Sequence, residues 1–167
     1  MKKSNVYEYF NRLIDPHPAE IKDWIVGVDK FLTENGCKID ALTNTPNTGT
    51  GVVFTYTYRQ NNKRICRIYM GAEGCKAFPY GHHFVYDNSI LTELPESMLD
   101  AMSYGENECT GCATKRPDLI THSFRYTHKS KSYNKCRRFG FGFSLDNADE
   151  RELLNKWIEM ELLCARI

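Results

Sequence analysis

Three cysteines are grouped in a way that could bind a metal ion. Cys109 and Cys112 form a CxxC motif around Gly111, and Cys136 follows further along the chain. A turn that contains glycine lets two thiolates converge on one ion, as in a zinc knuckle. Tetrahedral zinc needs a fourth ligand, and His122 is the candidate for it. The sequence therefore predicts a zinc site formed by Cys109, Cys112, Cys136 and His122.

Two other states of these thiols stay open. They could remain unliganded in a reducing cytosol, or a disulfide could form between Cys109 and Cys112 or involve Cys136. A thioredoxin-like redox role is disfavoured, because that chemistry needs the CxxC at the start of a helix and here it lies in a loop. The turn that sets the register near Cys136 is not fixed by the sequence. The further candidates for a fourth ligand are therefore His128, His82, His83 and Cys75.

Tyrosines and one arginine are grouped on a predicted hairpin. Residues 52–59 and 64–70 alternate in character on either side of Asn61-Asn62. Asparagine tolerates the positive φ of a tight turn, so a hairpin with a two-residue loop is expected. In that register Tyr56 lies opposite Arg67.

Tyr58 and Tyr69 fall on the same predicted face as Tyr56 and Arg67. Burying an unpaired arginine is costly, so Arg67 should line a polar cleft, extend along its stem to solvent, or pair with an acid such as Glu96. In a cleft the guanidinium would bind a carboxylate or phosphate in bidentate fashion, and the tyrosines would supply stacking area. The sequence therefore predicts a site for a small anionic or aromatic ligand at Tyr56, Tyr58, Arg67 and Tyr69.

Charge is unevenly distributed although the net charge is only +1, from 22 Lys+Arg and 21 Asp+Glu. Residues 87–108 carry acids but no Lys or Arg, whereas residues 41–72 and 119–145 carry no acid. A basic surface with aromatic side chains could bind nucleic acid through phosphate neutralisation and base stacking. The alternative function is therefore nucleic-acid interaction through the second hairpin. The competing interpretation is that this basic face is only solvated and binds nothing.

Motifs for common enzyme reactions are absent from the sequence. There is no GxSxG, P-loop, HExxH or GxGxxG, and most acids lie on predicted outer helix faces. His82 and His83 are adjacent, so on a strand they would point to opposite faces. An enzyme with unidentified catalytic residues stays an alternative, and a non-enzymatic binding protein is favoured.

The periodicity predicts a single α+β domain over residues 1–167, with antiparallel hairpins packed against amphipathic helices. Pro18 precedes a strong apolar stripe that Asn35-Gly36 should end, and Asn147 should cap the last helix. The expected strands, besides the first hairpin, are residues 75–78, 82–86, 120–128 and 133–145.

Composition also bounds the cellular setting. No run of 18 apolar residues exists, so no membrane span is expected. The start of the chain is basic, but Glu8, Asn11 and Arg12 interrupt any apolar stretch behind it, so it does not resemble a secretory signal. Seven cysteines at irregular spacing are typical of free thiols, so a cytoplasmic protein is expected.

The sequence resembles a set of small uncharacterised bacterial proteins. The likeness rests on the CxxC at Cys109 and Cys112, on residues 133–137 with the pattern YNKCR, and on the helix start Leu94-Pro95-Glu96-Ser97-Met98. It covers about residues 90–167 and implies a small cytosolic bacterial protein. The order of helices and hairpins is also similar to that of gyrase-inhibitor-like ligand-binding proteins. That second likeness implies only a paired α+β unit around a cleft.

Overall fold

The computed structural model describes residues 3–43, 51–72, 74–104, 123–136 and 140–167, and its fold is α+β. The helices are α1 (Lys3–Ile14), α2 (Ala19–Glu34), α3 (Glu96–Tyr104) and α5 (Ala148–Arg166), with short 3₁₀ helices η1 (His82–Val85) and η2 (Ser89–Thr92). The strands are β1 (Cys37–Thr43), β2 (Val52–Tyr58), β3 (Arg64–Gly71), β4 (Gly74–Pro79), β5 (Ser123–His128), β6 (Lys131–Cys136) and β7 (Phe143–Ser144).

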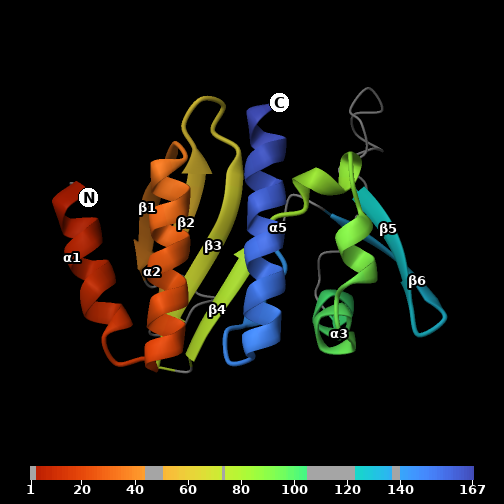
Figure 1. Cartoon of the computed structure of the whole chain (residues 1–167), viewed down its shortest axis with the longest axis horizontal. Helices are drawn as coiled ribbons and strands as arrows, with labels where there is room; N and C mark the ends of the chain where they lie inside the picture. Colours follow the sequence, from red (N-terminus) through yellow and green to blue (C-terminus); the bar gives the residue numbers. More distant parts are fainter. Residues whose placement is uncertain (1–2, 44–50, 73, 105–122, 137–139) are drawn as a thin grey trace.

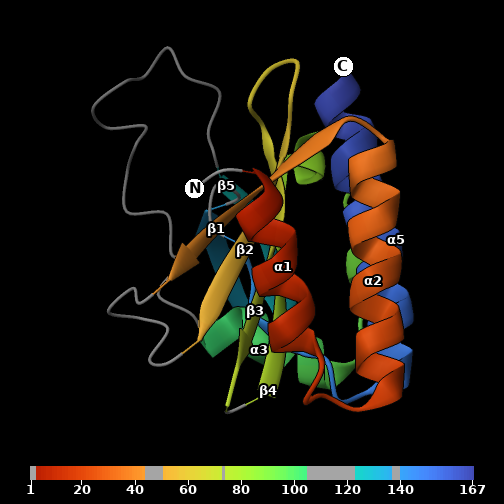
Figure 2. The same ribbon diagram turned by 90° about the vertical axis from the view of Figure 1, so that its left-hand side faces the viewer.

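Strands β1-β2-β3-β4-β7 form one antiparallel sheet in that order, and β5 and β6 form a separate hairpin. Helices α1, α2 and α5 cover one face of the sheet, which we call the helix face (Figures 1 and 2). Helix α3 and the β5–β6 hairpin lie beside the sheet, beyond α5 (Figure 1). None of the described helices lies over the opposite face, which we call the second face.

Helix α2 forms where the apolar stripe predicts it. Ile21, Ile25, Val28 and Leu32 are buried at helical spacing and pack in the core beneath the helix. Gly36 has a φ of +90°, a conformation that glycine adopts without strain, so the chain turns here into β1.

Helix α5 is held at both its start and its middle. The Asn147 side chain accepts hydrogen bonds from the backbone N–H groups of Asp149 and Glu150, which confirms the predicted N-cap. The Glu150 carboxylate accepts a hydrogen bond from the Ser97 hydroxyl at 2.5 Å and so ties α5 to α3. In the middle of the helix the indole of Trp157 donates to the Tyr80 carbonyl at 2.6 Å.

Two strand predictions need correction, and one strand was missed. Strand β1 was not predicted, although it pairs with β2 over its whole length. The strand predicted over residues 82–86 does not form: His82–Val85 is the 3₁₀ helix η1, because the chain turns there to pack against α5. The strand predicted over residues 133–145 is divided: β6 ends at Cys136, and Phe143 pairs with Ala77 of β4.

The register of the first hairpin also differs from the prediction. The loop is longer than Asn61-Asn62, because the Tyr58 N–H already bonds the Lys63 carbonyl. A bulge between Tyr56 and Thr57 then shifts the register by one residue, so that Tyr56 lies opposite Cys66 and Thr55 opposite Arg67. Since successive side chains alternate between faces, this shift places Tyr56 and Arg67 on opposite sides of the sheet.

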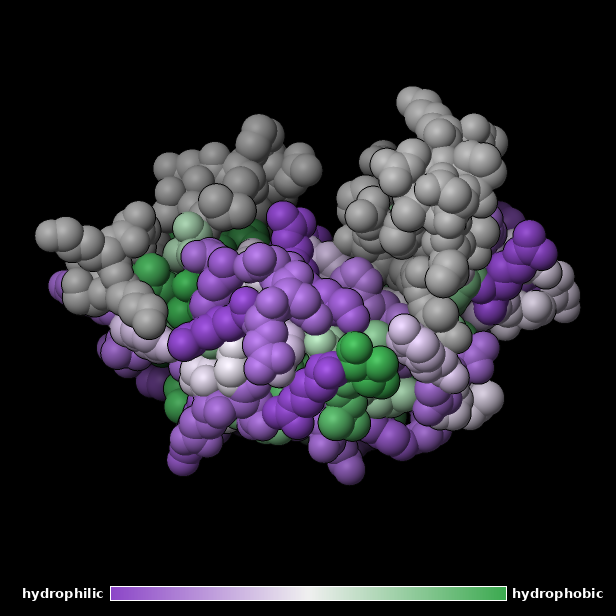
Figure 3. Space-filling view, turned by 90° about the horizontal axis from the view of Figure 1, so that it is seen from above, coloured by the Kyte–Doolittle hydropathy of each residue, from purple (hydrophilic) through white to green (hydrophobic). Residues whose placement is uncertain are grey.

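The surface seen from above is mostly hydrophilic, with a compact hydrophobic patch near its centre and further hydrophobic areas elsewhere on the same face (Figure 3). Among the described residues, Leu163 and Ile167 at the end of α5 are large hydrophobic side chains left exposed. No described helix is both long and apolar enough to cross a membrane.

Candidate functional site

Two of the four predicted ligand residues lie on the helix face. The side chain of Tyr56 is fully buried, and Tyr58 is nearly so, within the main core. The Tyr56 hydroxyl donates to Asp29 of α2 at 3.0 Å, and burial raises the pKa of both groups. Tyr56 therefore joins α2 to β2 and is not available to a ligand, which corrects the prediction.

The second face holds Arg67 together with Tyr69, as the sequence predicts for this pair. The guanidinium carbon of Arg67 lies 5.1 Å from the ring centroid of Phe78 and 5.8 Å from that of Tyr80. Tyr80 in turn stacks on the His82 ring, with centroids 5.6 Å apart and planes inclined by 1°. We call Arg67, Tyr69, Phe78, Tyr80 and His82 the Arg67 platform.

Arg67 has no acidic partner among the residues that the structure describes. The predicted pairing with Glu96 does not occur, because Glu96 pairs with Lys129. The Nε atom of Arg67 is buried and has no hydrogen-bond acceptor among the described residues. A half-buried guanidinium with aromatic neighbours and no counter-ion is suited to binding an anion.

Glycines give the Arg67 platform its shape. A Cβ at Gly71 would lie 2.2 Å from the Tyr69 hydroxyl, so the Tyr69 ring lies close over the strand backbone. A Cβ at Gly140 would lie 2.7 Å from the Phe78 carbonyl oxygen, and one at Gly142 would lie 2.6 Å from the edge of the Phe78 ring. The rings can thus lie flat only because these neighbours carry no side chain.

Sequence reasoning missed Phe78, Tyr80 and His82 as members of this group. Cross-strand neighbours are decided by register, and Arg67 pairs with Phe78 only in the observed alignment of β3 with β4. A signal was present in the alternation along β4 and into the residue that follows it: residues 76, 78 and 80 fall on one face of the chain, which places Phe78 and Tyr80 on the same side.

The predicted zinc site can be followed only at Cys136, because Cys109, Cys112 and His122 lie outside the described residues. Cys136 is buried at the end of β6 and pairs with Ser123. Lys129 and Ser130 form the hairpin turn, with φ values of 48° and 61°. In this register Cys136 lies on the face of the hairpin opposite to His128, so His128 is a poor fourth ligand. The zinc site stays a prediction.

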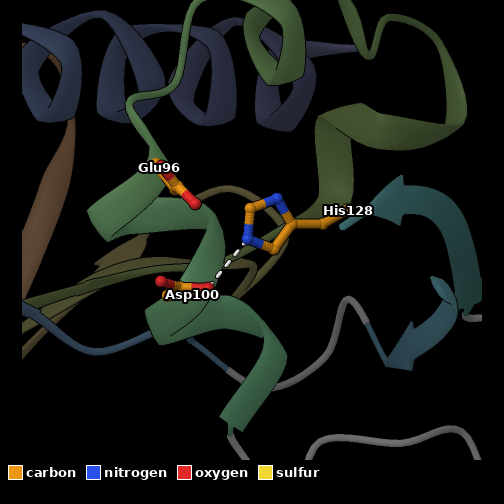
Figure 4. A group of neighbouring side chains, drawn as sticks. All are labelled: Glu96, Asp100 and His128. Carbon is orange, nitrogen blue, oxygen red and sulfur yellow. Dashed lines mark hydrogen bonds and ion pairs between the residues drawn. The ribbon is translucent and has the colours of Figure 1, made fainter. Parts of the chain in front are cut away.

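A different group of side chains that could bind a metal ion lies where α3 meets the β5–β6 hairpin. Glu96 and Asp100 lie one turn apart on α3 and point toward His128 at the end of β5 (Figure 4). One ligand atom from each of the three side chains lies within 4.8 Å of the others, and this is the one such group in the described part of the chain. We call these three residues the α3–β5 cluster.

The α3–β5 cluster already holds a positive charge. Lys129 Nζ lies 3.0 Å from Glu96 and 2.9 Å from Asp100, and His128 Nε2 lies 2.8 Å from Asp100. Hydrogen bonds from Lys129 and His128 lower the pKa of Asp100, and the same carboxylates raise the pKa of Lys129. The Asp100 carboxyl therefore stays ionised to a lower pH than an ordinary aspartate does.

Two lysines of the basic second hairpin already bind other groups of the protein. Lys129 is paired with two carboxylates, and Lys135 is buried, with its ammonium donating to the Ser103 carbonyl at 3.1 Å. Arg137 and Arg138 lie outside the described residues. Arg125 and Lys131 are exposed on the hairpin.

No family model matches the chain, and the comparisons with curated proteins and with solved structures give no match either.

Proposed function

We propose that the Arg67 platform binds a small anionic ligand that carries a flat aromatic group. The observation that supports this proposal is the Arg67 guanidinium, which lies beside two aromatic rings without an acidic partner among the described residues. Arginine binds carboxylate or phosphate in a fork geometry, and the charge-assisted bonds are stronger than neutral ones.

The neighbouring rings supply the second half of the recognition. Phe78 and Tyr69 are half-buried and lie on the same face as Arg67, so a planar ligand group can pack on them while its anion meets the guanidinium. Tyr56 and Tyr58, which the sequence included in the site, hold the sheet to the helices instead.

The proposal is tested by calorimetric titration with adenosine 5′-monophosphate, which combines an aromatic base with a phosphate. Adenosine and inorganic phosphate, titrated separately, should bind more weakly than the nucleotide because each makes half of the contacts. Arg67→Gln should weaken nucleotide binding about tenfold or more, the expected effect of losing a charge-assisted hydrogen-bond pair.

Arg64→Gln is the matched control, because Arg64 is exposed on the same strand and contacts neither Phe78 nor Tyr80 in the described structure. Equal affinity of the Arg67→Gln and Arg64→Gln variants would contradict the proposal. A single-stranded oligonucleotide whose binding depends on Arg125 and Lys131, and not on Arg67, would favour the nucleic-acid alternative.

A further inference from the structure

The α3–β5 cluster combines three side chains that are ordinary ligands of divalent transition metals. Glu96 and Asp100 occupy consecutive turns of α3, so both carboxylates project from one side of the helix toward β5 (Figure 4). The His128 imidazole is nine-tenths buried and faces them from the end of β5, with Nε2 2.8 Å from Asp100. Two elements that are distant in sequence thus supply one ligand set.

His128 is fixed in this position by its strand and its turn. Phe124, Tyr126 and His128 alternate onto the buried face of β5, and the Lys129-Ser130 turn follows at once. The imidazole is therefore held on the buried face, in contrast to an exposed histidine. A ligand set that is already oriented costs less ordering when an ion binds.

Lys129 occupies the place of a cation in this group. Its ammonium bridges the two carboxylates, but the side chain is 55% exposed and belongs to the tip of the hairpin turn. Exposed ion pairs of lysine are weak, so the ammonium can move into water when a stronger cation arrives. The carboxylate charge that Lys129 balances would then be available to a metal ion.

We propose that Glu96, Asp100 and His128 form a binding site for a divalent transition-metal ion, which displaces the Lys129 ammonium. His128 binds the ion through Nε2 in its neutral form with the proton on Nδ1, and each carboxylate supplies one oxygen. Water fills the remaining coordination positions, because the described structure offers three protein ligands. This site is separate from the Arg67 platform and does not depend on the function proposed for it.

Titration with Mn²⁺ tests the site, since this ion favours carboxylate and water over the thiolates of the predicted cysteine site. Chelator-treated protein should bind one Mn²⁺ per chain, measured by calorimetry and by the loss of the free-ion electron paramagnetic resonance signal. Asp100→Asn and Glu96→Gln should each weaken binding about tenfold or more, as expected for loss of a ligand. Glu96 is exposed, so the second variant should fold normally even if Asp100→Asn does not.

Lys129→Met separates a metal site from a merely structural cluster of charges. Removal of the competing ammonium should tighten Mn²⁺ binding about three- to tenfold, the equivalent of two exposed ion pairs. Glu93→Gln is the control, because Glu93 is also an exposed carboxylate but pairs with Lys156 and is not a member of the cluster. The proposal is wrong if the wild-type protein binds no Mn²⁺, if Glu96→Gln binds it as tightly as Glu93→Gln does, or if Lys129→Met leaves the affinity unchanged.

Discussion

His83 and Glu161 are the least ordinary side chains in the interior. Their exposed fractions are 3% and 1%, and the His83 Nδ1 and backbone N–H both bond the same Glu161 oxygen. Glu161 Oε2 and His83 Nε2 are buried and have no hydrogen-bond partner in the described part of the chain. Burial raises the pKa of Glu161, although its contacts with His83 oppose the rise. The pair joins α5 to η1, yet it leaves polar atoms unsatisfied, so it is a costly way to join two elements.

The raised pKa of Glu161 predicts a pH-dependent stability. Because the folded state resists ionisation of this carboxyl, the unfolded state loses the proton first, and the free energy of unfolding falls as pH rises from the usual value of 4.5 through the raised pKa. Glu161→Gln, which does not ionise, should lack this loss. Urea unfolding of both proteins from acidic to neutral pH measures the difference. The exposed Glu159→Gln is the control, and a wild-type profile parallel to that of Glu161→Gln would contradict the prediction.

At the level of helices and strands, the periodicity of the sequence predicted the features that depend on residues close together in the chain. The apolar stripe of α2, the cap at Asn147 and strands β2 to β4 are all confirmed, because each is determined by neighbours within a few residues. The bulge between Tyr56 and Thr57 has no such local signal. It places Tyr56 and Arg67 on opposite faces of the sheet, so the four predicted ligand residues are divided between two faces although strands β2 and β3 form where they were predicted.

The glycines beneath the Arg67 platform give a test at this scale. Gly140→Ala should destabilise the protein by about 1–3 kcal/mol, because the new methyl group would meet the backbone carbonyl of Phe78, which cannot move freely. Gly142→Ala should cost less, since it meets only the edge of the Phe78 ring. Gly27→Ala in α2 is the control: nothing lies within 4 Å of the new atom, and the higher helix propensity of alanine should stabilise the protein by about 0.5–1 kcal/mol. Chemical denaturation orders the three variants, and equal losses at Gly140 and Gly142 would contradict the packing argument.

At the scale of the whole molecule, an aromatic cluster joins the β5–β6 hairpin to the sheet and its helices. The Phe124 ring of β5 stacks on Phe84 at 4.1 Å and meets Phe141 edge-on at 5.6 Å. Phe84 and Phe141 both contact Trp157 of α5, which lies at the centre of the core. The hairpin therefore shares one apolar core with the main sheet, as a single domain over residues 1–167 requires.

Phe124→Ala tests whether this shared core makes the chain one cooperative unit. Removal of the ring should cost about 3–5 kcal/mol, because it leaves a cavity among Phe84, Phe141 and the neighbouring core. If the hairpin and the sheet fold together, the loss lowers a single transition, and near-ultraviolet circular dichroism and hydrogen exchange in β5 report the same midpoint. Tyr86 is an exposed aromatic residue outside the core, so Tyr86→Ala should leave the free energy of unfolding within about 0.5 kcal/mol of the wild-type value. The contrary result is two separate unfolding transitions in the wild type, with the β5 amides exchanging through an opening whose free energy is far below that of global unfolding. It would show that the hairpin is a unit of its own and would overturn the single-domain prediction.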